Sequence, residues 1–279
     1  MTAGPGARGE GRRALVRRPS LRLSAGLVTH IERQPVDVEL AVRQWRAYVD
    51  AMRSAGWSTV EVAPADDCPD SVFIEDAMVV YGDLAVIASP AEPSRRGELP
   101  AAEKAVAGLG YRLAHIEPPG TLDGGDVLKV GSLVYVGLSK RTNEDGARQL
   151  AGILSPLGAR VEPVPVTKTL HLKSAVSALP DATVIGYPEL VDDTASFDRF
   201  LAVPEPAGAH VVLLGDERLM IAASAPQTAE IFHSMGYRPV VVDISEFEKL
   251  EGCVTCLSVR LRGGAPGQPA GGSSGAQPA

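Results

Sequence analysis

Apolar and polar residues alternate along the chain in a rhythm that repeats. Four times, a helix-like segment ends in a glycine and a short apolar strand follows at once, beginning at Gly56, Gly110, Gly158 and Gly236. A glycine in this place is typical of a helix C-cap in the left-handed conformation. The pattern therefore predicts helices over residues 38–55, 98–109, 144–157 and 226–235. The first of them has apolar residues spaced by three and four.

A β-hairpin is predicted after each unit of this kind. The four hairpins cover residues 72–87, 126–136, 175–185 and 211–222, and each turns at Gly or Asp. The long interval before Gly236 holds one more unit, with a short helix near 194–201 and a strand near 202–204. Residues 254–261 are expected to pair with residues 14–17 from the other end. The sequence thus predicts five strand–hairpin–helix units.

Five similar units in one chain favour a closed ring. We expect an α/β fold, a five-bladed pseudo-symmetric propeller closed by the N- and C-terminal strands, since closure removes the exposed sheet edge. The alternative is an open, doubly wound α/β sheet, which usually has one strand per helix, whereas this pattern has about three. Residues 12–262 are expected to form this single domain.

Composition restricts the class of protein, its binding partners and its location in the cell. The chain has 279 residues, of which 45% are hydrophobic and 22% charged, as in an ordinary globular protein. A net charge of −7 gives no bulk attraction for nucleic acid or anionic lipid. No apolar run approaches the ~20 residues of a membrane span, and no signal peptide is evident. With only three cysteines, a cytoplasmic location is expected. The tails, residues 1–11 and 263–279, are expected to be disordered.

Four chemically active residues hold similar places in the repeat. Asp70, Asp123 and His171 stand 13 or 14 residues after the glycine of their unit, and Cys256 stands 20 after Gly236. Equivalent positions in a ring surround one axis, so these side chains should converge at one end of it.

The residue types suggest a thiol hydrolase for a cationic substrate. A cysteine becomes a strong nucleophile once a nearby positive charge lowers its pKa, and His171 or a cationic substrate can supply that charge. His171 can also protonate a leaving group and then activate water. Several carboxylates together suit a planar guanidinium.

Six segments of the sequence carry a family resemblance. They are residues 68–76, 94–98, 121–128, 137–143, 170–174 and 255–258. In this order, over residues 14–261, they resemble the dimethylarginine dimethylaminohydrolases. This family belongs to the guanidine-modifying enzymes, whose fold is a five-bladed α/β propeller.

The resemblance implies a reaction and a catalytic set. The implied reaction is hydrolysis of Nω-methylated arginine, such as asymmetric dimethylarginine or monomethylarginine, to citrulline and a methylamine. Cys256 is the implied nucleophile and forms a covalent thiouronium. His171 is the implied general acid and base, and Asp123 orients it. No organic cofactor and no metal is expected.

The same resemblance implies contacts to the substrate. They are a guanidinium clamp of Asp70 and Glu75, an α-carboxylate grip of Arg95 and Arg141, an α-amine contact from Asp76 and the backbone of Leu23, and further pocket positions at Ser174 and Glu251. Glu251 stands where relatives often carry aspartate. Residues 21–31 are a candidate lid.

Some alternatives remain at this stage. Adjacent on one strand, Glu75 and Asp76 would point to opposite faces, so only a kinked chain lets both touch one ligand. Cys253 has no counterpart in the family pattern. As strand residues, Cys253 and Cys256 would also point apart, which argues against a shared metal but leaves redox behaviour open.

The other functions considered are an arginine deiminase-like hydrolase and a non-catalytic propeller that binds a macromolecule. The sequence leaves a homodimer open.

Overall fold

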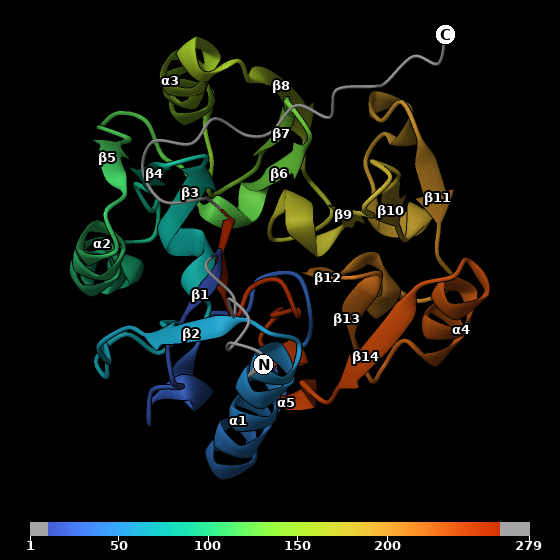
Figure 1. Cartoon of the computed structure of the whole chain (residues 1–279). Coiled ribbons are helices and arrows are strands. Elements are labelled where there is room, and N and C mark those ends of the chain that lie inside the picture. Colours follow the sequence, from blue (N-terminus) through green and yellow to red (C-terminus); the bar gives the residue numbers. More distant parts are fainter. Residues whose placement is uncertain (1–10, 263–279) are drawn as a thin grey trace, which may run out of the picture.

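The computed structural model describes residues 11–262. The expectation of disordered tails concerns residues 1–11 and 263–279, all of which except Gly11 lie outside this range. Within it, the chain forms five three-stranded sheets (Figure 1). In every sheet the middle strand is antiparallel to one neighbour and parallel to the other.

The strands follow the predicted repeat closely. The first sheet contains β15 (Val259–Arg262), β1 (Arg12–Val16) and β2 (Ser58–Glu61); the second β3 (Met78–Tyr81), β4 (Leu84–Ile87) and β5 (Arg112–His115); the third β6 (Val127–Val130), β7 (Leu133–Leu138) and β8 (Arg160–Pro165); the fourth β9 (Val176–Ala178), β10 (Val184–Gly186) and β11 (Phe200–Ala202); the fifth β12 (Val212–Gly215), β13 (Arg218–Ala222) and β14 (Arg238–Val242).

In four sheets an α-helix leads into the parallel strand. These helices are α1 (Val38–Ser54), α2 (Leu99–Gly108), α3 (Glu144–Leu154) and α4 (Pro226–Ser234), while α5 (Ser245–Glu248) is a single turn. The glycines that follow α1 to α4 (Gly56, Gly110, Gly158 and Gly236) have φ of 87°, 88°, 86° and 90°. Glycine adopts this left-handed conformation without the clash of a Cβ atom, which confirms the predicted C-caps.

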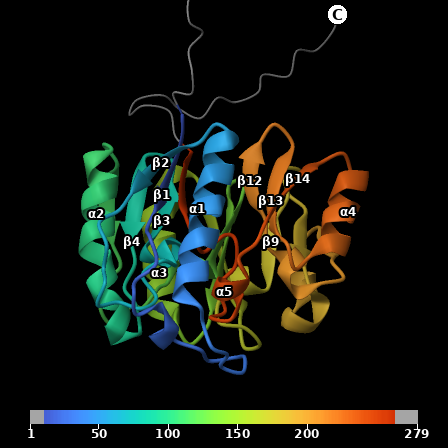
Figure 2. The same ribbon diagram turned by 90° about the horizontal axis from the view of Figure 1, so that it is seen from below.

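The two ends of the described chain meet in one sheet. Strand β1 pairs with β15 antiparallel, with Leu15 opposite Val259, as predicted. Figures 1 and 2 show the helices on the outside of the molecule and the strands inside. Among the described residues, no helix has both the length and the apolar character needed to cross a bilayer.

Besides β11 (Phe200–Ala202), which begins two residues before the strand predicted near 202–204, three elements differ from the sequence prediction. The first hairpin strand begins only at Met78, because Ile74–Ala77 forms a 3-10 turn. The helix predicted near 194–201 is one 3-10 turn, Thr194–Ser196, whose backbone is capped by the Asp193 carboxylate. The last strand begins at Val259, since residues 254–257 form a turn. At the first and the last of these places, a turn replaces the beginning of the predicted strand.

Candidate active site

The predicted site residues come from loops that lead into the sheets. Asp76 precedes β3, Asp123 precedes β6, His171 precedes β9 and Cys256 precedes β15. The structure brings most of the predicted set around one small cavity of about 20 Å³. Its predicted lining residues are Asp70, Asp76, Arg95, Arg141, His171, Glu251 and Cys256. Asp123 lies behind His171.

His171 is buried between carboxylates. Its Nε2 lies 3.0 Å from Asp123 Oδ2, and its Nδ1 lies 3.8 Å from Asp76 Oδ1. Burial alone would lower the pKa of His171, but the Asp76 charge and the Asp123 hydrogen bond outweigh it and raise the pKa to about 9. At neutral pH the ring is therefore an imidazolium, ready to donate a proton.

Asp76 is held ionised by its neighbours. Its carboxylate accepts hydrogen bonds from Arg95 Nη1 at 2.5 Å and from the Gly125 backbone N–H at 2.9 Å. Burial favours the neutral acid, but the charges of His171 and Arg95 overcome it and lower the pKa of Asp76 to about 2. A Cβ atom at position 125 would lie only 2.5 Å from Asp76 Oδ1, so this approach requires glycine.

Asp76, Asp123 and His171 also have the spacing of metal ligands. One ligand atom from each lies within 4.8 Å of the others. However, Arg95 already donates a hydrogen bond to Asp76. The high pKa of His171 also keeps both ring nitrogens protonated, whereas a metal binds a neutral imidazole with one free nitrogen. These residues suit a histidine–carboxylate network better than a metal centre.

The two predicted carboxylate-binding arginines differ in what they can still donate. Arg95 donates hydrogen bonds from Nε and Nη2 to Glu98, at 2.9 and 2.8 Å, and from Nη1 to Asp76. Few of its five N–H donors therefore remain for a substrate. Arg141 lines the cavity, and its buried Nη1 has no hydrogen-bond partner among the described residues. Arg141 is therefore the stronger candidate for binding an anionic group, and Arg95 positions Asp76.

Asp126 ties two of the site loops together. One of its oxygens accepts from Ser139 and Thr142, each at 2.7 Å, and the other accepts from the Leu172 backbone N–H at 2.9 Å. Burial raises its pKa to about 6 despite the nearby His171 charge. The loop that carries Arg141 and the loop that carries His171 are thus joined through one carboxylate.

Cys256 lies beside a second thiol. Its Sγ is 3.2 Å from Cys253 Sγ, so the prediction that the two residues point apart is wrong. That prediction assumed a strand, whereas Cys256 N–H donates to Cys253 C=O across a turn. One thiol of the pair ionises first, and the hydrogen bond between the sulfurs lowers its pKa to about 5. The same hydrogen bond, together with burial, raises the pKa of the other thiol. The pair therefore shares one proton near neutral pH.

The segment after Gly26 covers the cavity. Leu27 lines it and donates its N–H to Asp70 Oδ1 at 3.0 Å, while the Glu251 carboxylate accepts from the backbone N–H groups of Thr29 and His30 at 2.9 and 2.5 Å. A cavity of about 20 Å³ has room for little more than a water molecule. An amino acid therefore fits only if some of the residues that line the cavity move.

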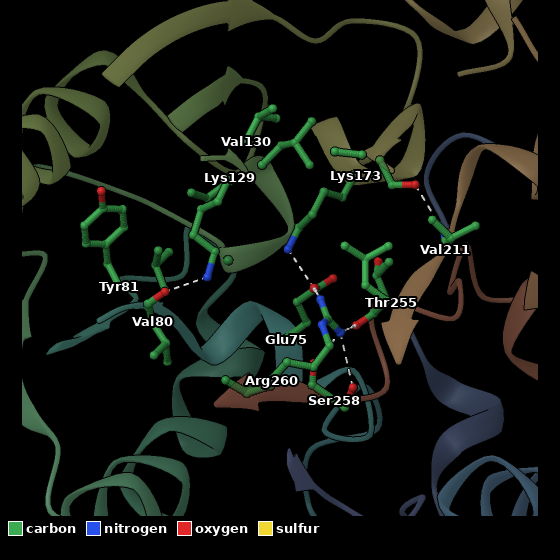
Figure 3. Close-up of a pocket in the computed structure, with 18 of the residues that line it drawn as sticks. Glu75, Val80, Tyr81, Lys129, Val130, Lys173, Val211, Thr255, Ser258 and Arg260 are labelled. Atoms are coloured by element: carbon green, nitrogen blue, oxygen red, sulfur yellow. Dashed lines mark hydrogen bonds and ion pairs between the residues drawn. The ribbon is translucent and has the colours of Figure 1, made fainter. Parts of the chain in front are cut away.

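Three predicted substrate contacts lie outside this cavity. The Glu75 carboxylate points into a separate cavity of about 510 Å³, where Lys173 and Arg260 each contact it at 2.6 Å (Figure 3). The 3-10 turn at Ile74–Ala77 sends Glu75 and Asp76 into different cavities, so the structure does not bring Glu75 into a clamp with Asp70. Leu23 is fully buried, and its carbonyl accepts from Gly26 N–H.

Ser174 also lies elsewhere. It lines a third cavity, of about 390 Å³, together with Cys253. Glu251 and Gly252 border both this cavity and the small one, so the two adjoin.

Sequence reasoning missed several contributors. The apolar wall of the small cavity consists of Leu27, Phe73, Leu170 and Leu250. Glu98, which holds Arg95 in place, follows it by three residues, a spacing that signals a pair within one helical turn. The apolar wall has no comparable signal, because such residues look like any other part of the core.

Comparison with known proteins supplies close relatives. No family model matches the sequence. The N(G),N(G)-dimethylarginine dimethylaminohydrolase of Streptomyces coelicolor is 62% identical over 251 residues, which cover 90% of this chain and 97% of the relative. The Pseudomonas aeruginosa protein of the same name is 34% identical over 251 residues, covering 88% and 98%.

A solved structure of the Pseudomonas aeruginosa protein has the same fold. This cysteine-to-serine variant, in complex with citrulline, superposes with a TM-score of 0.84 at 32% identity. The match covers 91% of this chain and 100% of that one.

Proposed function

This chain belongs to the family of N(G),N(G)-dimethylarginine dimethylaminohydrolases, and from that premise we propose how its site performs the family's reaction. It hydrolyses Nω-methylated arginine, asymmetric dimethylarginine or monomethylarginine, to citrulline and a methylamine. The observation that carries the assignment is the single cavity shared by Cys256, an imidazolium at His171 and the carboxylates of Asp70 and Asp76. The citrulline-bound relative supports the product.

The cationic substrate favours the thiolate form of Cys256, which is the nucleophile. Because Cys253 and Cys256 share a proton, a guanidinium beside Cys256 favours the thiolate on Cys256 and the proton on Cys253. Asp76 is ionised and lies 3.8 Å from His171, so we assign the guanidinium to Asp76 and the α-amine to Asp70, the reverse of the roles expected from the sequence. Asp70 accepts from the Leu27 backbone N–H, away from His171, while Arg141 suits the α-carboxylate. The guanidinium carbon then lies between thiolate and imidazolium.

The reaction proceeds in two displacements. Cys256 Sγ attacks the guanidinium carbon, and His171 gives its proton to the departing methylamine, leaving a thiouronium on the sulfur. The neutral imidazole then takes a proton from water, which attacks the same carbon and releases citrulline and the thiolate. The Asp123 carboxylate holds the ring and stabilises its charged form throughout.

The wider setting is part of the same proposal. The common strand order of the five sheets and the β1–β15 pairing support a pseudo-symmetric five-bladed α/β propeller. Residues 12–262 then act as one catalytic domain. We further propose a cytoplasmic enzyme that needs no cofactor or metal and binds no nucleic acid. Analytical sedimentation distinguishes a monomer from a homodimer.

A product assay tests the function. Purified protein is incubated with asymmetric dimethylarginine, monomethylarginine or arginine, and citrulline and the released amine are measured together. We expect citrulline and dimethylamine in equal amounts from asymmetric dimethylarginine, and citrulline and methylamine in equal amounts from monomethylarginine. Citrulline mainly from arginine would instead indicate a deiminase, and no citrulline from any of the three would refute the hydrolase.

The Asp123→Asn variant should change the pH profile. His171 must be protonated to act as an acid, so wild-type activity should persist below pH 9 and fall as the pH rises through about 9. An amide at position 123 removes a charge that raises the pKa of His171, so the alkaline limb should move to lower pH. The kcat should fall about a hundredfold, as measured by citrulline release across the pH range. If the alkaline limb of the pH profile does not move in the variant, Asp123 does not raise the pKa of His171.

A further inference from the structure

The two neighbouring thiols offer chemistry beyond hydrolysis. Cys253 and Cys256 are free and buried, with 4% and 7% exposure, and their sulfurs lie 3.2 Å apart. A disulfide needs an S–S distance of about 2.05 Å, so closure requires a movement of about 1 Å. The turn already fixes the approach, because Cys253 N–H donates to Cys256 Sγ at 3.4 Å.

We propose that Cys253 and Cys256 form a reversible disulfide that switches the enzyme off, with a hydroperoxide as the oxidant. A sulfur that takes part in this bond cannot attack a guanidinium carbon. Cys253 thus serves as the resolving cysteine for the nucleophile. The proposal rests on the proposed role of Cys256 only for its effect on activity, since the bond itself can form whatever the protein's function.

The chemistry balances without further components. One thiolate of the pair attacks the O–O bond of the hydroperoxide, which leaves as an alcohol, or as water from hydrogen peroxide, and the sulfur becomes a sulfenic acid. The other thiol attacks that sulfur and displaces water, which forms the disulfide. Counted as two thiols, the pair gives up two electrons and two protons, and the hydroperoxide is reduced to an alcohol and water. The low first pKa of the pair supplies the thiolate.

The cavities give the reagents a route. Cys253 lines the cavity of about 390 Å³, which also contains His210, and Cys256 lines the substrate cavity. A small oxidant can therefore approach Cys253 through a cavity other than the one that binds the substrate. Cys68, the third cysteine, lines neither cavity and has no thiol neighbour, which makes it a matched control.

Intact mass and activity after peroxide test the proposal. With one to a few equivalents of hydrogen peroxide, wild-type protein should lose the mass of a pair of hydrogen atoms. Peptide mapping should show Cys253 linked to Cys256, activity should fall at least about tenfold, and dithiothreitol should restore both. The Cys68→Ala variant should behave identically.

The Cys253→Ser variant separates the switch from plain oxidation. It should gain oxygen atoms on Cys256 and recover poorly with dithiothreitol, because a sulfinic acid is not reduced by thiols. Activities are compared with each variant's own untreated value. Oxygen addition without a Cys253–Cys256 link in the wild type would overturn the proposal. A linked but always inactive wild type would instead refute the hydrolase, and with it the effect of the disulfide on activity, while formation of the disulfide would stand.

Discussion

The Cys256→Ala variant is expected to fold and to lose at least about ten-thousandfold in kcat, because it removes the thiol that lines the substrate cavity, while Cys253 lines a different cavity. Cys256 belongs to a buried cluster but is small, so the loss of its sulfur leaves a modest gap. Citrulline release and the thermal unfolding midpoint, measured on the same preparation, separate chemistry from folding.

The matched control is Cys68→Ala, which removes an equally buried thiol away from the substrate cavity. It should retain near wild-type kcat. Comparable loss in both variants, or substantial activity in Cys256→Ala, would exclude Cys256 as the nucleophile.

The His171→Gln variant is expected to lose about a thousandfold in kcat, since glutamine can hydrogen-bond to Asp123 but cannot protonate the leaving amine. The KM should change far less, because the ring acts on the leaving group rather than on the amino-acid end. Removing the imidazolium also leaves Asp76 and Asp123 with one cation fewer, so the unfolding midpoint should fall.

The contribution of His171 to stability has a definite sign. Its folded pKa of about 9 lies above the usual 6.5, so the stabilisation is complete below pH 6.5 and is lost as the pH rises through 9. The midpoints of wild type and His171→Gln should therefore converge at high pH. The exposed, paired His115 provides the control, as His115→Gln should alter neither kcat nor this pH dependence. A kcat within tenfold of wild type in His171→Gln would refute the acid–base role.

Much of the fold follows from local signals. The left-handed glycines, the turn residues and the apolar spacing mark the helices and hairpins within a few residues, because backbone geometry restricts those positions to few residue types. Where the prediction differs, short turns stand in place of regular elements. Thr194–Ser196, for example, is a single 3-10 turn where a longer helix was expected, and a strand begins at Phe200.

The site was partly predictable because the repeat places Asp70, Asp123, His171 and Cys256 at related positions, and the structure brings them together. What could not be predicted is side-chain direction at irregular backbone. A 3-10 turn separates Glu75 from Asp76, and a tight turn brings Cys253 against Cys256. Both departures from strand geometry change which groups meet, and no alternation rule applies to them.

The most direct test of the central claim is to trap the intermediate. Wild-type protein turning over asymmetric dimethylarginine is quenched with acid and digested, and the peptide that carries Cys256 is weighed and fragmented. The account predicts a thiouronium adduct on Cys256, equal in mass to the substrate less dimethylamine, and its absence from Cys256→Ala. An adduct on any other residue, or full citrulline production by Cys256→Ala, would contradict it.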